Sequence, residues 1–187
     1  MRILIACEYT GAVRDAFRSL GEEAYSCDVR ESDSKFHLHG DVRQYLNDGW
    51  DLMIAHPPCT HLAVSGARWF KDKGQHQKEA LEFVRLLLDA PIPKIALENP
   101  VSIISTKIRK PDQIVQPWWF GDSYQKTTCL WLKGLPLLQK TNVVSPGEFV
   151  IHGGRKLPKW YSNRSRSRDA TFPGMARAMA EQWRLPS

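Results

Sequence analysis

Cys59 stands in the segment Pro57-Pro58-Cys59-Thr60, directly after an apolar run at residues 50–55. Consecutive prolines can neither donate sheet hydrogen bonds nor enter a helix interior, so the run should be a strand that stops there and leaves Cys59 on a sharp turn. A thiol on such a turn is exposed, and nearby positive charge can convert it into a thiolate nucleophile. The other three cysteines lie in apolar patterns typical of buried, structural cysteine: Cys7, Cys27 and Cys129.

A carboxyl group follows a second apolar run, in the segment Glu98-Asn99-Pro100. We expect Glu98 to lie on the same sheet edge as Cys59, where partial burial would raise its pKa and let it hold or donate a proton. The alternative is an acid in a surface turn that Asn99 stabilises. Two unusual strand ends favour a reactive site over that alternative.

The elements that must position these side chains alternate between strands and helices. Short apolar runs predict strands at residues 2–7, 24–29, 50–55, 94–100 and 129–132, and helical spacing of apolar residues predicts helices at 11–20, 75–88 and 173–183. This alternation predicts an α/β fold with a doubly wound, mostly parallel sheet, whose ligand crevice lies along the carboxyl ends of the strands. His37 and His39 are expected in a loop.

The composition is that of an ordinary globular protein of 187 residues, 42% hydrophobic and 25% charged, which predicts one domain over 1–187. No apolar run reaches the length of a membrane span, and the N-terminus lacks a signal-peptide pattern, so we expect a cytoplasmic protein with reduced thiols. The net charge of +6 favours an anionic partner such as nucleic acid or a phosphorylated small molecule. Residues 133–170 form a basic, turn-rich insert.

Several of these segments resemble the motifs of cytosine-C5 DNA methyltransferases. Residues 51–59 resemble the proline-cysteine nucleophile motif, and residues 96–100 resemble the Glu-Asn-Val motif. Residues 3–17 look like the first S-adenosylmethionine loop, residues 120–131 are similar to the Gln-x-Arg-x-Arg motif with its strand, and residues 171–180 to the closing helix. The resemblance implies a Rossmann-like methyltransferase fold, S-adenosylmethionine as cofactor and DNA as partner.

The resemblance also implies roles for individual residues. Cys59 would attack C6 of cytosine, Glu98 would hydrogen-bond N3 and the amino group, and Asn99 would position the loop or the base. Cofactor contacts would come from Cys7, Glu8, Tyr9, Thr10, Gly11, Asp28, Val29, Asp41, Val42 and Pro58. Substrate contacts would come from Gln125 and from the basic residues Arg164, Arg166 and Arg168.

The sequence departs from the family pattern in three places. The cofactor loop has one glycine, Gly11, and Thr127 and Cys129 stand where the family has two arginines, so Arg164, Arg166 and Arg168 are candidates to replace them in space. The insert is too short for a separate DNA-reading domain, which indicates little sequence selectivity or a protein partner that supplies target recognition. Its cations and aromatic residues suit phosphates and bases.

Three alternatives remain beside the DNA methyltransferase hypothesis. In the first, the same chemistry acts on a cytosine nucleotide or on RNA. In the second, the chain is a catalytically degenerate nucleic-acid-binding module. The third is a catalytic zinc site, whose ligand types are matched by His56, Cys59 and His61. The adjacent prolines and the family resemblance argue against zinc, so no metal is expected.

Overall fold

The computed structural model describes residues 1–64, 74–158 and 170–184. Arg164, Arg166 and Arg168, three of the expected substrate contacts, lie outside the described residues. None of the helices in the described part combines the length and apolar character that crossing a bilayer requires.

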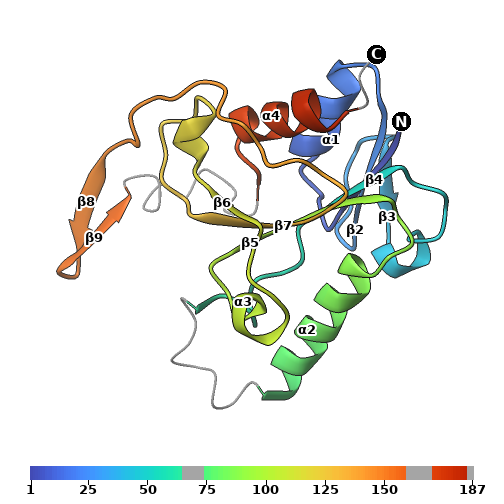
Figure 1. The fold of residues 1–187 in the computed structure, drawn as a ribbon, viewed down its shortest axis with the longest axis horizontal. Coiled ribbons are helices and arrows are strands. Elements are labelled where there is room, and N and C mark those ends of the chain that lie inside the picture. The colour runs from blue at the N-terminus through green and yellow to red at the C-terminus, as the bar shows by residue number, and fades with distance from the viewer. Residues whose placement is uncertain (65–73, 159–169, 185–187) are drawn as a thin grey trace.

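A seven-stranded sheet forms the centre of the molecule, in the order β3-β2-β1-β4-β5-β7-β6 (Figure 1). Its strands are β1 (Arg2–Ala6), β2 (Glu23–Asp28), β3 (His37–His39), β4 (Leu52–Ala55), β5 (Lys94–Pro100), β6 (Gln113–Val115) and β7 (Thr128–Lys133). All neighbouring pairs from β3 to β5 are parallel, while β7 runs antiparallel to both β5 and β6. The expected doubly wound, mostly parallel α/β sheet is therefore confirmed.

Helices cover both faces of this sheet. On one face, α1 (Ala12–Ser19) and α4 (Pro173–Trp183) pack together over a core cluster that includes Ile3, Ile5 and Trp183 (Figure 1). On the other face, α2 (Gly74–Leu88) contributes to a second cluster with Leu4 and Trp131, near the short α3 (Ile104–Lys107). Alternate residues of β1 thus enter opposite clusters, which explains why this central strand is apolar throughout.

The structure adds short elements that the sequence pattern did not predict. Among them are the edge strands β3 and β6, single 3-10 turns at Val42–Gln44 and Pro117–Trp119, and the hairpin β8 (Phe149–His152) with β9 (Arg155–Pro158). The expectation that His37 and His39 lie in a loop is wrong, because both belong to β3 and pair with β2. The hairpin extends away from the sheet within the insert (Figure 1).

The strand register aligns four side chains that carry chemistry. Ala6 pairs with both Cys27 and Ala55, and Ala55 pairs with Leu97. The residues that follow these four are Cys7, Asp28, His56 and Glu98, which therefore stand in one row at the carboxyl ends of adjacent strands. Since the chain winds in opposite directions from β1 and β4, this row crosses the switch point where open α/β sheets bind ligands.

Gly11 is required where the first loop enters α1. Its φ of 76° is left-handed, and a Cβ there would collide with the guanidinium of Arg14. That guanidinium is buried and donates to Ser26 Oγ at 2.8 Å, so it cannot easily move away.

We therefore expect Gly11→Ala to lower the free energy of unfolding by about 1–3 kcal/mol, through backbone strain and the displaced Arg14. Urea unfolding monitored by circular dichroism measures this. Gly21→Ala is the matched control for strain alone, because Gly21 also has a positive φ of 84° but nothing within 4 Å of its Cβ position. An equal loss in both variants would show that the Arg14 contact is unimportant.

Candidate functional site

Glu8 anchors the loop that follows β1. Its Oε1 accepts a hydrogen bond from the Val13 amide at 2.8 Å, and its Oε2 accepts one from the Arg14 amide at 3.3 Å. These donors are otherwise unsatisfied amides of the first turn of α1, so a carboxylate is favoured there. Burial nevertheless raises the pKa of Glu8 above its ordinary value, outweighing the positive charge of His56 and these two hydrogen bonds. Glu8 therefore holds the loop in place from inside the protein.

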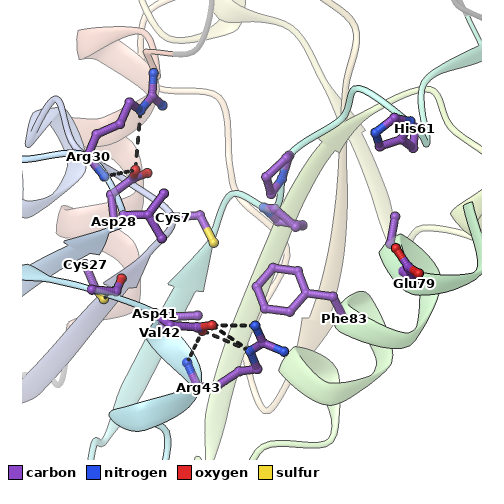
Figure 2. A pocket seen from close by; sticks show the side chains of 15 residues that line it. Cys7, Cys27, Asp28, Arg30, Asp41, Val42, Arg43, His61, Glu79 and Phe83 are labelled. Atoms are coloured by element: carbon purple, nitrogen blue, oxygen red, sulfur yellow. Dashed lines mark hydrogen bonds and ion pairs between the residues drawn. The ribbon is translucent and has the colours of Figure 1, made fainter. Parts of the chain in front are cut away.

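Two neighbouring cavities lie at this edge of the sheet. The first, called the larger cavity below, has a volume of about 680 Å³ and opens beside the carboxyl ends of β1, β2 and β4. Its wall includes the acids Asp28 and Asp41 and the apolar side chains Val29, Val42 and Phe83. The Phe83 ring points from α2 into the cavity (Figure 2). A space of this size and mixed lining is typical of small-molecule sites.

Both aspartates of the larger cavity have arginine partners. Asp28 is buried, and its Oδ1 accepts from the Arg30 amide at 2.9 Å and from Arg30 Nε at 3.3 Å. Asp41 forms an ion pair with Arg43, whose hydrogen bonds and charge hold the pKa of Asp41 below its ordinary value. Both carboxyl groups are thus fixed at the wall (Figure 2).

The Cys59 cavity, of about 340 Å³, lies beyond the ends of β4 and β5. Its wall includes Cys59, Glu98, Asn99 and Lys126. The turn that carries Cys59 is fixed on both sides: Asn99 Nδ2 donates to the Pro57 carbonyl at 2.9 Å, and the Cys59 carbonyl accepts from two later amides, those of Leu62 and Ala63. Cys59 itself is exposed. The structure thus brings the thiol and the carboxyl group to one cavity.

Glu98 is paired with a histidine that the motif analysis did not select. His56 Nδ1 and Glu98 Oε2 are 3.1 Å apart, and both side chains are almost completely buried, at 8% and 11% exposure. Burial alone would raise the pKa of Glu98, but the hydrogen bond to His56 and the charges of Lys126 and His56 outweigh it, so the pKa lies below its ordinary value. The expectation of a raised pKa is wrong, because it considered burial without the partners.

This lowered pKa predicts an acid-sensitive contribution to stability. A carboxyl group whose pKa is lower in the folded state stabilises the fold above its unfolded pKa, about 4.3 for glutamate, and loses that contribution as the pH falls through the folded value. We expect the stability advantage of the wild type over Glu98→Gln to shrink as the pH falls below about 4.3. Urea unfolding of both proteins between neutral and acid pH measures this. A difference that stays constant with pH would contradict it.

The two cavities share a wall. Five residues line both: Cys7, Asp28, Arg30, Pro57 and Pro58. Two molecules bound in these cavities would therefore be neighbours. The arrangement suits the transfer of a group from one ligand to another.

The predicted cofactor residues divide into three sets. Six line the larger cavity, namely Cys7, Asp28, Val29, Asp41, Val42 and Pro58. Glu8, Tyr9 and Thr10 instead line a small cavity of about 10 Å³, together with Cys7, Arg30, His56 and Thr171. Gly11 precedes α1 and does not line these cavities, and neither does Gln125, one of the expected substrate contacts.

Residues of the site to which sequence reasoning gave no role include Arg30, Phe83 and Lys126, and it weighed His56 only as a zinc ligand. His56 carried a signal, because it directly precedes the two prolines and so had to lie at the same strand end as Cys59. Phe83 was predicted only as a core position of its helix. Nothing in the sequence indicated that Arg30 would pair with Asp28.

The zinc alternative finds no support in the geometry. No three side chains of histidine, cysteine, aspartate or glutamate gather as metal ligands within residues 1–64, 74–158 and 170–184. His56 faces Glu98, while His61 stacks on His76 with ring centroids 5.0 Å apart.

Comparison with known proteins supports the fold. No protein-family model matches the chain, and no curated protein gives a significant match. Among solved structures, the chain is similar to that of a prophage-encoded protein of E. coli, which is described as a proposed DNA modification methyltransferase. The two share 14% sequence identity and a TM-score of 0.50, over 78% of this chain and 52% of the other, so this chain spans about half the length of that protein. At this identity the likeness concerns the fold, which is methyltransferase-like.

Proposed function

We propose that this protein is an S-adenosylmethionine-dependent methyltransferase that modifies C5 of cytosine in DNA through a covalent bond to Cys59. The observation that carries the proposal is the shared wall between the larger cavity and the Cys59 cavity. A methyl donor and an acceptor base held in the two cavities would lie next to each other, because five residues line both cavities. The methyltransferase-like fold supports the same assignment.

The larger cavity fits the methyl donor in size and chemistry. Asp28 and Asp41 offer carboxylate oxygens to the hydroxyl and amino groups of a nucleoside, and Val29, Val42 and Phe83 offer an apolar surface to its flat base. S-adenosylmethionine, when bound, supplies an activated methyl group.

Cys59 would act on the base as a nucleophile. Cytosine is electron-poor at C6, so addition of the Cys59 thiolate there makes C5 electron-rich and ready to accept a methyl group. Loss of the C5 proton then breaks the bond between sulfur and C6 and releases Cys59. The role requires an accessible thiol, and Cys59 is the exposed cysteine among the four.

Glu98 and Asn99 would assist from the adjacent strand. The Glu98 carboxyl group can accept a hydrogen bond from the amino group of cytosine and, when protonated, donate one to N3, which draws electrons from the ring. Asn99 fixes the Pro57 carbonyl and thereby the turn that presents Cys59. Asn99 is therefore a positioning residue in this proposal.

DNA is the preferred substrate because of charge and access. The net charge of +6 favours a polyanion, and Lys126 adds a cation at the Cys59 cavity. A base in duplex DNA must leave the stack to enter such a cavity. A cytosine nucleotide or RNA would require the same chemistry, and the salt dependence of binding distinguishes a polymer from a mononucleotide.

The test is transfer of labelled methyl from S-adenosylmethionine to duplex DNA, single-stranded DNA, RNA and cytosine nucleotides in parallel. We expect label in DNA, at C5 of cytosine after hydrolysis to nucleosides. Label confined to RNA or nucleotides would replace the substrate and keep the chemistry. No label on any acceptor, with donor binding shown by calorimetry, would overturn the proposal in favour of a nucleic-acid-binding module.

A further inference from the structure

We propose that His56 is a positioning residue that stores the proton which Glu98 delivers to the base. The inference rests on the proposed function and deepens it. It arises from a buried arrangement of two carboxyl groups around one imidazole, which nothing in the sequence motifs indicated.

The first observation is the direct contact between His56 and Glu98. Their 3.1 Å separation from Nδ1 to Oε2 is a hydrogen bond between buried groups, so His56 fixes one carboxyl oxygen while the carboxyl group lines the Cys59 cavity. His56 lines that cavity too. A proton can therefore move from the imidazole to the carboxyl group without passing through solvent.

The second observation concerns the other side of the imidazole. His56 Nε2 is buried and makes no hydrogen bond within the described part of the chain. Across the small cavity stands Glu8, whose interaction with His56 is attractive. Two acids, from the loop after β1 and from β5, thus stabilise a positive charge on the ring between them.

Other charged and titratable groups complete these surroundings. Those that share a cavity wall with His56 are Cys7, Tyr9, Asp28, Arg30, Cys59 and Lys126. Arg30 is paired with Asp28, and its guanidinium stacks over the Tyr9 ring at 3.6 Å. Lys126 favours the ionised form of Glu98. Glu98 in its resting state is thus a carboxylate that needs a proton source to become a donor.

The proton movements balance around this pair. As the Cys59 thiolate adds to C6, the displaced electron pair moves through the ring to N3. Glu98 takes a proton from the His56 imidazolium and passes it to N3. C5 then takes the methyl group from the sulfonium donor, which leaves as a neutral thioether. When the C5 proton leaves to water acting as the base and the bond from sulfur to C6 breaks, N3 returns its proton through Glu98 to His56. The His56 imidazolium and the Glu98 carboxylate are restored, and Cys59 leaves as thiolate.

The decisive variant is His56→Asn. Its amide can still donate a hydrogen bond to Glu98 but holds no transferable proton, so we expect kcat for methyl transfer to fall by about 10²–10³-fold. The alkaline limb of the wild-type pH profile should also disappear, because that limb reports loss of the imidazolium proton. His76→Asn is the matched control, since His76 is an exposed histidine outside both cavities, and it should keep the wild-type profile.

A His56→Asn enzyme with the wild-type pH profile would overturn the inference and leave the proposed function standing. A wild type that transfers no methyl group to any acceptor would overturn both.

A second measurement applies even if His56→Asn does not fold. In protein labelled with ¹⁵N-histidine, the ring nitrogen signals of His56 should shift in Glu98→Gln relative to the wild type, because His56 Nδ1 then meets a neutral amide instead of a carboxylate. Unchanged ring signals would overturn the inference.

Discussion

Cys59→Ser is expected to lower methyl transfer by about three orders of magnitude or more, because the variant keeps the shape of the site and loses the nucleophile. A serine hydroxyl is scarcely ionised near neutral pH, so it cannot take the place of the thiolate. Donor binding should be unchanged, since Cys59 lines the Cys59 cavity and not the larger one. Radiolabel transfer and calorimetry with S-adenosylmethionine measure the two effects separately.

The matched control for Cys59→Ser is Cys129→Ala. Cys129 is buried on β7 and lines neither cavity, so its loss should affect stability more than transfer. DNA carrying 5-fluorocytosine adds a direct observation, because fluorine at C5 cannot leave as a proton and the sulfur bond should persist. We expect a covalent complex with the wild type and none with Cys59→Ser. A Cys59→Ser enzyme that retains transfer would place the nucleophile elsewhere.

Glu98→Gln is expected to reduce kcat by about 10²–10⁴-fold, which is the usual contribution of a positioned acid or base. Glutamine preserves the volume of the side chain, and its oxygen can still accept the hydrogen bond from His56. Its amide group cannot transfer a proton to N3, and its NH₂ would face the amino group of cytosine with a donor where an acceptor is needed. Single-turnover measurements at saturating DNA separate this loss from weaker binding.

Glu82→Gln serves as the control for Glu98→Gln. Glu82 is exposed on α2, where it pairs loosely with Lys78 at 3.9 Å, and its replacement should leave both kcat and stability nearly unchanged. If Glu98→Gln transferred methyl as fast as Glu82→Gln, the carboxyl group would have no part in the reaction, and the stored proton of His56 would have no acceptor. Cys59→Ser would then still test the nucleophile independently.

The sequence by itself determined the main strands and helices and the position of the two reactive groups along the chain. Short apolar runs that end in proline or an acid can be recognised as strands from the local sequence alone, because burial on both faces requires every residue of a central parallel strand to be apolar. The paired prolines before Cys59 and the acid at Glu98 marked two strand ends without knowledge of any contact. The placement of both at one sheet edge followed from the alternation of strands and helices.

The tertiary structure decided which groups touch. His56 and Glu98 are 42 positions apart in the sequence. They meet because Ala55 pairs with Leu97 on the neighbouring strand, and His56 and Glu98 are the residues that directly follow this pair. That contact reverses the expected pKa shift of Glu98, which no local pattern could reveal. Similarly, the three-residue strands β3 and β6 are too short to show a period of their own and exist through pairing with longer neighbours. A contact that is set by strand register depends on two segments together, so it cannot be predicted from the local sequence of either segment alone.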